Sequence, residues 1–355
     1  MNNDRIQEIL DLMEEARLDY FLISDPQSIA YCTGYYNDPH ERMFVFMISK
    51  HGNHTLFMND LFYLEHDLDV NIVWHKDEQD AIQTIVDEMH FPGRIGIDKN
   101  WASHFLLDLM KKLPDAKYIN ASPCVDLVRM KKDLQEQVLM IESSKINDAV
   151  MEEIIPFIQE GVTEKQLAKK LDELFFNHHS TCYGAIVAFG KNAADPHHEN
   201  DDTPLRKGDC VLIDMGCVYK GYCSDMTRTF FYEGILEEEI KVYEIVKKAN
   251  EAAEAMIKPG VKLSDIDKCA RKVISDEGYG KYFTHRLGHF IGRDVHEYGD
   301  VSSVNEMEVE EGMIFSIEPG IYLEGNFGVR VEDLVMVTKD RCQVLNSFTK
   351  DIYII

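Results

Sequence analysis

The first 120 residues carry apolar positions at two different spacings. Residues 4–17 place apolar side chains three and four positions apart, which is typical of an amphipathic helix. Strands are expected at residues 20–23, 43–48, 55–58 and 94–97, and further helices at 77–90 and 103–112. Because helices and strands alternate, the pattern predicts an N-terminal α/β domain over residues 1–122.

The remainder of the chain combines long helical patterns with short β-rich runs. Ser122 and Pro123 indicate a boundary, so residues 123–134 are predicted as a linker and residues 135–355 as a second, α+β domain. Helices are expected at 134–157, 163–177, 237–257 and 264–277, and β-rich runs at 182–190, 209–217, 227–232, 313–323 and 329–338. Helices and strand pairs therefore occur twice in similar order, which hints at an internal duplication.

Composition and charge narrow the classes of function. A length of 355 residues favours two domains, and a net charge of −26 would repel phosphate backbones, so nucleic-acid binding is not expected. The N-terminus lacks a basic and apolar signal sequence, and no apolar run is long enough to span a membrane. The eight cysteines form no Cys-x-x-Cys pair. These features predict a cytoplasmic protein with reduced, mostly buried thiols.

Two carboxylates interrupt neighbouring β-type runs. Asp214 lies within the apolar run 211–216, and Asp225 follows eleven residues later. Lys220 and Gly221 between them indicate a turn, so adjacent strands would bring both carboxylates together. Burial of an ionised carboxylate costs several kcal/mol unless it is paired or binds a metal ion.

A similar pattern recurs near the C-terminus. Glu318 ends one apolar run, Glu332 lies in another, and a histidine cluster at residues 285–296 precedes them. A single buried acid is more often a structural ion pair, whereas four acids and a histidine could form a two-metal site, and their spacing alone leaves both interpretations open. Carboxylate-rich ligation favours Mn²⁺, with Co²⁺ or Zn²⁺ as alternatives, and two such ions would share a bridging hydroxide as the nucleophile of a hydrolase.

Around these residues the sequence resembles the pita-bread metallopeptidases, which include prolidases, aminopeptidases P and methionine aminopeptidases. The matching motifs are residues 195–198 (DPHH), 208–229 (GDCVLIDMGCVYKGYCSDMTRT), 285–297 (HRLGHFIGRDVHE), 316–322 (SIEPGIY) and 328–333 (GVRVED). The N-terminal domain resembles the creatinase-type domain of prolidases, which argues against a simple methionine aminopeptidase. The resemblance implies a C-terminal pita-bread fold and a homodimer.

The resemblance also implies the metal ligands by position. They would be Asp214, Asp225, His289, Glu318 and Glu332. Asp225 and Glu332 would bridge two ions, Asp214 would hold one of them, and His289 and Glu318 would hold the other. Glu318 also matches the general base that takes a proton from the attacking water. Thr227, Thr229 and Arg330 would orient the ligands.

The substrate-side residues follow from the same motifs. His197 matches the substrate-side histidine of the family, and His296 matches the histidine that contacts the scissile carbonyl or the oxyanion. His285 and Arg286 lie beside the metal-binding motif and are expected to contact the substrate. Arg286 and Phe290 stand where many relatives have glycine, so we expect both to narrow the pocket.

The resemblance implies metal-dependent hydrolysis of Xaa-Pro dipeptides. The first alternative is an Xaa-Pro aminopeptidase of the aminopeptidase P type, which shares the catalytic residues and differs in what it tolerates after proline. The second alternative is a metal-binding interaction module without activity. The presence of His197 and His296 beside five ligands disfavours that alternative, because a scaffold does not need donors to an oxyanion.

Overall fold

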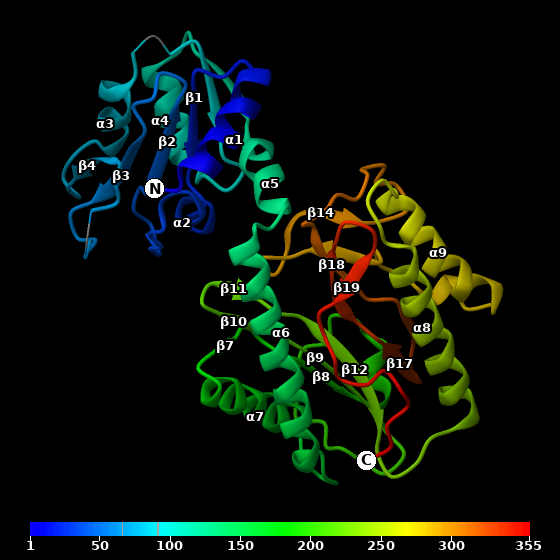
Figure 1. Cartoon of the computed structure of the whole chain (residues 1–355). Coiled ribbons are helices and arrows are strands. Elements are labelled where there is room, and N and C mark those ends of the chain that lie inside the picture. The colour runs from blue at the N-terminus through cyan, green and yellow to red at the C-terminus, as the bar shows by residue number, and fades with distance from the viewer. Residues whose placement is uncertain (66, 91) are drawn as a thin grey trace. The chain divides into compact units, whose positions relative to one another are not determined.

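The computed structural model describes residues 1–65, 67–90 and 92–355, and the chain divides into two compact units (Figure 1). The units are Met1–Arg129 and Met130–Ile355. The predicted linker, residues 123–134, contains most of helix α5 (Ser122–Met130), and the border between the units falls one residue before this helix ends. The connection is therefore helical.

The N-terminal unit is built on a mixed sheet with strand order β4-β3-β2-β1-β5-β6. The strands are β1 (Tyr20–Ile23), β2 (Val45–Ser49), β3 (Thr55–Asn59), β4 (Asn71–His75), β5 (Arg94–Ile97) and β6 (Lys117–Asn120). Strands β1 and β5 pair in parallel, whereas β1 and β2 are antiparallel. The expected α/β architecture of this unit is confirmed.

Helices cover both faces of this sheet. They are α1 (Asn3–Glu15), α2 (Pro26–Thr33), α3 (Ala81–Glu88), α4 (Ser103–Lys112) and α5. Phe21 and Ile23 of β1 pack in a core with α1, α2 and α5, whereas Tyr20 and Leu22 pack in a second core with α3 and α4. The alternation follows from the two-residue period of a strand.

Four elements of this unit were not predicted, namely helices α2 and α5 and strands β4 and β6. Helix α2 begins at Pro26, and the Asp25 carboxylate caps it by accepting a hydrogen bond of 2.8 Å from the Ser28 amide. Asp25 and Pro26, which closely follow the strand expected at residues 20–23, thus begin a helix. Strands β4 and β6 lie at the two edges of the sheet, where partial exposure leaves no clear apolar pattern.

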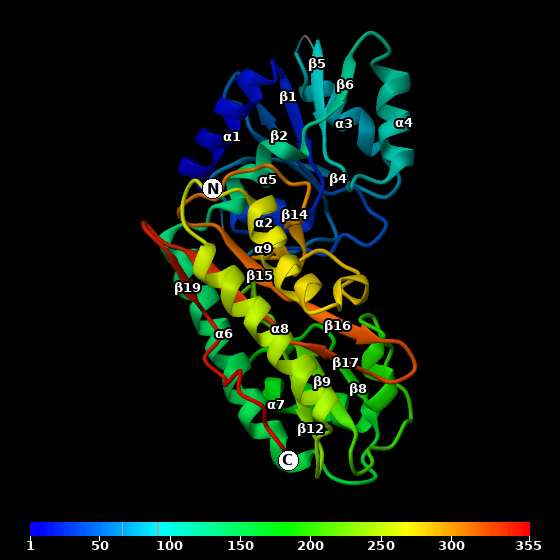
Figure 2. The same cartoon turned by 90° about the vertical axis from the view of Figure 1, so that its right-hand side faces the viewer.

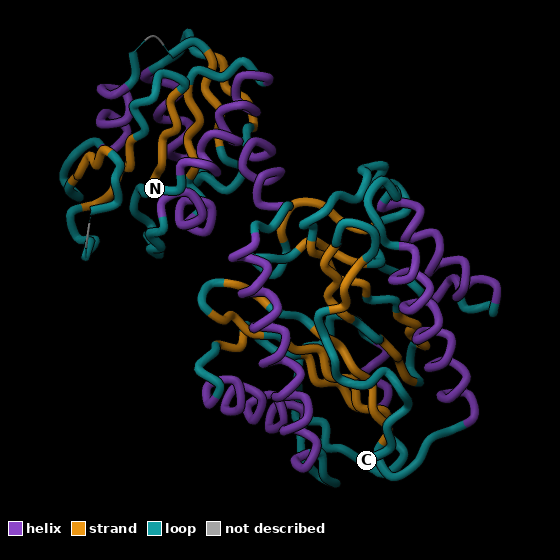
Figure 3. The backbone as a smooth tube through the Cα atoms, viewed as in Figure 1, coloured by secondary structure: helices purple, strands orange, loops and turns teal. Residues whose placement is uncertain are grey.

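The C-terminal unit contains two helix pairs, α6 with α7 and α8 with α9. Their bounds are α6 (Leu134–Ile154), α7 (Glu164–Asn177), α8 (Glu237–Met256) and α9 (Leu263–Asp276). Helix α7 starts with a capping box, in which Thr163 and Gln166 exchange hydrogen bonds. In chain order each helix pair is followed by strands, so the expected repeated order of elements is present. Figure 3 shows the helices and strands of the chain in different colours.

The strands of this unit form several antiparallel sheets. They are β7 (Thr181–Cys182), β8 (Ile186–Phe189), β9 (Cys210–Met215), β10 (Cys217–Tyr219), β11 (Tyr222–Cys223), β12 (Met226–Phe231), β13 (Gly288–Phe290), β14 (Glu297–Val301), β15 (Ile314–Ile317), β16 (Gly320–Leu323), β17 (Phe327–Arg330), β18 (Asp333–Val337) and β19 (Cys342–Val344). Strands β8, β9 and β12 pack on α6 and α7. Helix α8 packs against β15, β16 and β17 (Figure 2). The predicted α+β class is confirmed.

Two observations concern the chemistry of the chain as a whole. All eight cysteines are free, and five of them are buried. Among the described residues, no helix combines the length and the apolar character that crossing a bilayer requires.

Candidate metal centre and active-site pocket

Neighbouring strands bring Asp214 and Asp225 to one end of a sheet. Asp214 lies on β9 directly opposite Thr227 of β12, and Asp225 precedes β12 by one residue. The β10–β11 hairpin between them turns at Lys220 and Gly221, whose φ angles are 48° and 83°. Two left-handed residues in a two-residue loop match the twist of a hairpin, so the turn predicted from the sequence is confirmed.

Strands β13 and β15 position His289 and Glu318. The His289 amide donates a hydrogen bond of 3.0 Å to Ser316 Oγ, and the Glu318 amide donates one of 2.8 Å to the Leu287 carbonyl. A Cβ atom on Gly288 would lie 1.9 Å from the Ser316 carbonyl oxygen. The strands can therefore approach this closely only because glycine precedes the histidine.

Glu332 connects the two halves of the site. It lies between β17 and β18, and its amide donates a hydrogen bond of 3.1 Å to the Thr227 carbonyl. Asp225, His289 and Glu332 are buried, and their potential ligand atoms lie within 4.8 Å of one another. His289 Nε2 is 3.6 Å from Asp225 Oδ2 and 3.6 Å from Glu318 Oε1.

Asp214 faces the same pocket, and its carboxylate is hydrogen-bonded to Arg330. Arg330 donates a hydrogen bond of 2.6 Å from Nη2 to Asp214 Oδ2 and one of 3.0 Å from Nε to Thr227 Oγ1. Thr227 in turn donates a hydrogen bond of 2.6 Å to Glu332 Oε2. Thr229 contacts the main chain of Arg330 rather than any of the five acidic and histidine residues.

Burial and mutual repulsion raise the pKa values of the acids. Burial raises the pKa of Asp214 to about 7, against the opposing effect of Arg330. Burial also raises the pKa of Glu318, and it raises the pKa of Glu332 well above the ordinary range, with Asp225 adding repulsion to both. Four carboxylates that share one buried site need more positive charge than Arg330 supplies, and divalent cations meet that need.

His289 has the orientation of a metal ligand. Its Nδ1 atom lies 3.2 Å from the Phe290 carbonyl, so a proton on Nδ1 leaves the lone pair of Nε2 facing the acids. Burial lowers the pKa of His289, but hydrogen bonding to Asp225 and the charge of Glu318 outweigh burial, and the pKa is raised. The residues present therefore fit a divalent metal centre.

The acids open onto a pocket of about 430 Å³. Its lining includes all five acidic and histidine residues together with Arg330, and also His197, His285, Arg286 and His296. The ring of His296 contacts that of His289 with centroids 4.3 Å apart. Burial is the main cause that lowers the pKa of both His285 and His296 to about 4, so both rings are neutral at pH 7.

Arg286 and Phe290 differ in where their side chains lie. Arg286 lines the pocket, is 42% exposed, and lies 3.9 Å from the Asp300 carboxylate. Phe290 is fully buried, packs against Phe315 with ring centroids 5.3 Å apart, and does not line the pocket. The expectation that Phe290 narrows the pocket is therefore wrong, because alternate residues of β13 face opposite sides.

Two tyrosines near the acids were missed. Tyr322 accepts a hydrogen bond of 3.0 Å from Arg330 and lies 2.9 Å from His285 Nε2. Tyr183 lines the pocket and donates a hydrogen bond of 2.8 Å to the Ser224 carbonyl. Tyr322 ends the motif at residues 316–322, which was a usable signal, whereas nothing in the sequence around Tyr183 indicates its place.

A second acidic and histidine cluster lies beside the loop that carries His197. His198 Nε2 is 2.6 Å from Glu164 Oε2, and Asp201 completes the cluster. The fully buried Glu164 also accepts hydrogen bonds from the Phe189 amide and from Asn192. These donors satisfy both carboxylate oxygens of Glu164. The cluster therefore stabilises the loop that carries His197.

Comparison with known proteins agrees with this architecture. Residues 138–339 match the metallopeptidase family M24, and residues 5–131 match the creatinase/prolidase N-terminal domain. An uncharacterized peptidase of Staphylococcus aureus (strain bovine RF122 / ET3-1) is 34% identical over 355 residues, which cover 98% of this chain and 99% of the relative.

Solved structures give the same result. A dipeptidase from Pyrococcus horikoshii OT3 has 34% identity and a TM-score of 0.92, with 99% of this chain and 100% of that chain covered. A prolidase from Thermococcus sibiricus has 32% identity and a TM-score of 0.94, with 100% and 99% covered.

Fold and pocket thus define a two-unit metallopeptidase. The chain belongs to metallopeptidase family M24, with a creatinase-type N-terminal domain and a pita-bread C-terminal domain of the prolidase and aminopeptidase P type. The resemblance stated from the sequence motifs is confirmed.

Proposed function

We propose that this protein hydrolyses Xaa-Pro dipeptides with two divalent metal ions. The observation that carries the proposal is the buried group formed by Asp225, His289 and Glu332, with Asp214 and Glu318 beside it in one pocket. Asp225 and Glu332 would bridge the ions, Asp214 would hold one, and His289 and Glu318 would hold the other. Similarity to a dipeptidase and a prolidase supports the choice of substrate.

Bound ions of this kind lower the pKa of water and polarise a carbonyl group. Glu318 is the proposed general base. Ser316 Oγ donates a hydrogen bond of 3.2 Å to Glu318 Oε1, which fixes one carboxylate oxygen and leaves the other for the proton of the attacking water.

Neutral histidines supply the remaining polar contacts. A neutral His296, whose ring contacts that of His289, can donate a hydrogen bond to the developing oxyanion. His197 also lines the pocket, on the loop held by Glu164, and is the proposed contact to the substrate backbone. His285 lines the pocket, and its ring is held in place by a contact of 2.9 Å from Nε2 to the Tyr322 hydroxyl.

Arg286 is the residue proposed to bind the substrate carboxylate. Its guanidinium lines the pocket, is partly exposed, and lies 3.9 Å from Asp300, a weak contact that an incoming carboxylate can replace. An arginine offers two parallel donors that match a carboxylate. A free carboxylate next to proline is the feature that separates a dipeptide from a longer peptide.

The alternative within the same family is an Xaa-Pro aminopeptidase, and the second alternative is a metal-binding module without activity. One assay separates all three. The full chain loaded with Mn²⁺ is tested on a Leu-Pro dipeptide and on a Leu-Pro-Gly tripeptide, with Asp225→Asn as the control for metal-dependent turnover. Cleavage of the dipeptide alone supports the proposal, cleavage of the tripeptide favours the aminopeptidase, and no cleavage of either overturns both enzymatic assignments.

Three further proposals follow from the resemblance and the ligand chemistry. We propose Mn²⁺ as the metal because most ligands are carboxylates, and metal analysis of protein purified without added metal tests this. We propose a homodimer, which light scattering tests. We propose a cytoplasmic location, which fractionation of the source cells tests.

A further inference from the structure

A side chain of helix α8 joins the backbones of two acid-bearing segments. Asn250 is fully buried, and its Nδ2 atom donates hydrogen bonds of 2.9 Å to the Ile317 carbonyl and 3.4 Å to the Val331 carbonyl. Ile317 immediately precedes Glu318, and Val331 immediately precedes Glu332. One amide group thus ties together the chain segments that carry both glutamates.

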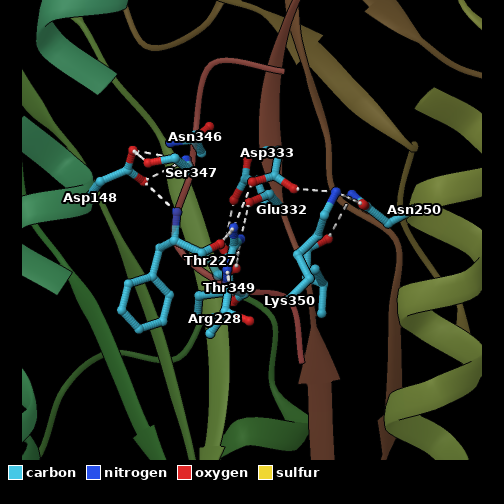
Figure 4. A network of polar contacts seen from close by, with 12 residues as sticks. Asp148, Thr227, Arg228, Asn250, Glu332, Asp333, Asn346, Ser347, Thr349 and Lys350 are labelled. Atoms are coloured by element: carbon cyan, nitrogen blue, oxygen red, sulfur yellow. Dashed lines mark hydrogen bonds and ion pairs between the residues drawn. The ribbon is translucent and has the colours of Figure 1, made fainter. Parts of the chain in front are cut away.

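The orientation of this amide is set by a lysine from the C-terminal segment. Lys350 Nζ donates a hydrogen bond of 2.8 Å to Asn250 Oδ1 (Figure 4). Because a lysine is only a donor, Oδ1 must face Lys350 and Nδ2 must face the two carbonyls. Lys350 also lies 2.8 Å from Glu254 and 2.9 Å from Asp333, so the lysine is itself held by two carboxylates.

Arg228, on strand β12, also holds the segment that carries Glu332. Its Nη2 atom lies 2.7 Å from Asp333 Oδ1, and its Nη1 atom donates hydrogen bonds to the Glu332 carbonyl at 2.6 Å and to the Thr227 carbonyl at 2.9 Å. Figure 4 shows Asn250, Lys350, Asp333 and Arg228 as one connected set of polar contacts. The backbone around Glu332 is therefore held on both sides by buried donors.

We propose that Asn250, oriented by Lys350, is a positioning residue that sets the separation between Glu318 and Glu332. The inference rests on the proposed function, in which these glutamates bind metal ions. A pair of ions requires carboxylates at closely defined positions, and partners behind the ligands typically alter metal affinity about 10–100-fold when removed. Without the amide, two buried carbonyls lose a donor, and only the pairing of β15 with β18 and the contacts of Arg228 still hold the segments that carry the glutamates.

The test measures metal binding rather than turnover. Metal-free Asn250→Leu and Asn250→Asp are titrated with Mn²⁺ by calorimetry, and electron paramagnetic resonance detects coupling between paired Mn²⁺ ions. We expect the second ion to bind at least about tenfold more weakly than in the wild type, with loss of the coupled signal. Asn250→Asp adds a negative charge, so a purely electrostatic role would instead strengthen cation binding.

Two further variants separate positioning from general stability. Lys350→Gln leaves Asn250 in place and removes the group that orients it, so an intermediate loss of the second ion is expected even if Asn250→Leu fails to fold. Asp148→Ala is the matched control, because Asp148 anchors the same C-terminal segment through the Ser347 and Phe348 amides at 2.8 Å and 3.0 Å without touching Asn250. This control should lower Tm and keep both ions.

The outcomes distinguish the inference from the function on which it rests. Two ions bound with wild-type affinity in the Asn250 variants would overturn the inference and leave the proposed function intact. If Asp148→Ala weakened binding of the second ion equally, the network would only stabilise the fold, and the inference would be overturned. A wild-type protein that binds no metal pair would overturn the proposed function instead.

Discussion

Arg330 donates a hydrogen bond of 2.6 Å to Asp214, which, like Glu318, lies in the pocket beside the tight group of Asp225, His289 and Glu332. The same guanidinium reaches Thr227, which donates to Glu332. One arginine therefore couples the positions of two acids, Asp214 on β9 and Glu332 between β17 and β18. Because it is buried and always charged, it also lowers the repulsion among the carboxylates.

The first prediction concerns this arginine. Arg330→Lys keeps the charge, but a single ammonium group cannot contact Asp214, Thr227 and Tyr322 together. We expect kcat/KM for Leu-Pro to fall about 10–100-fold, the usual cost of losing a partner behind a metal ligand. Steady-state kinetics with the exposed Arg206→Lys as control measures this. Unchanged kcat/KM in Arg330→Lys would show that charge alone is sufficient.

The second prediction concerns the proposed base. Glu318→Gln preserves the size of the side chain and one oxygen but cannot take a proton at neutral pH. We expect kcat to fall at least about 100-fold, the lower range for acid–base catalysis. Metal analysis should accompany the kinetics, with the exposed Glu324→Gln as control. A kcat near that of the wild type would assign the proton transfer to another group.

The third prediction concerns pH and chelation. Burial raises the pKa of Asp214 to about 7, so the folded metal-free protein keeps a proton that the unfolded chain, with a pKa near 4, releases. The metal-free protein therefore loses stability as pH rises from about 4 to about 7, because the folded state then binds more protons than the unfolded state. Bound cations remove this loss of stability, because they stabilise the ionised carboxylates in the folded state.

The measurement compares Tm with Mn²⁺ and with chelator. We expect the gain in Tm on adding Mn²⁺ to be larger at about pH 7.5 than at about pH 5.5. Asp214→Asn, which lacks the titrating group, should show a flatter dependence on pH. A gain that is equal at both pH values would mean that the acids remain ionised without metal.

The fourth prediction concerns substrate selection by Arg286. Arg286→Gln keeps most of the length and removes the charge. We expect KM for Leu-Pro to rise about tenfold or more, as for loss of a charge-assisted contact, and KM for the amidated dipeptide to change little. Asp300→Asn is the matched control, because it frees Arg286 and should not raise KM. An equal change for both substrates would show that Arg286 does not contact the carboxylate.

Local patterns were sufficient for much of the fold. The turn predicted at Lys220 and Gly221 is confirmed, because it depends on two adjacent residues. The helix expected at residues 163–177 is confirmed as α7, whose capping box joins residues only three positions apart. Helix α2 was missed because a capping aspartate and a proline also end strands. The edge strands β4 and β6 were missed because partial exposure removes the apolar signal.

The candidate site shows the same division between local and long-range information. The sequence by itself determined which acids interrupt apolar runs, because an acid such as Asp214 within a strand is chemically conspicuous wherever the strand lies. Only the tertiary structure decided that Phe290 turns away from the pocket, that Tyr183 faces it, and that Asn250 and Lys350 lie behind Glu318 and Glu332. Such contacts join residues up to about a hundred positions apart, and no local periodicity records which distant segments will meet.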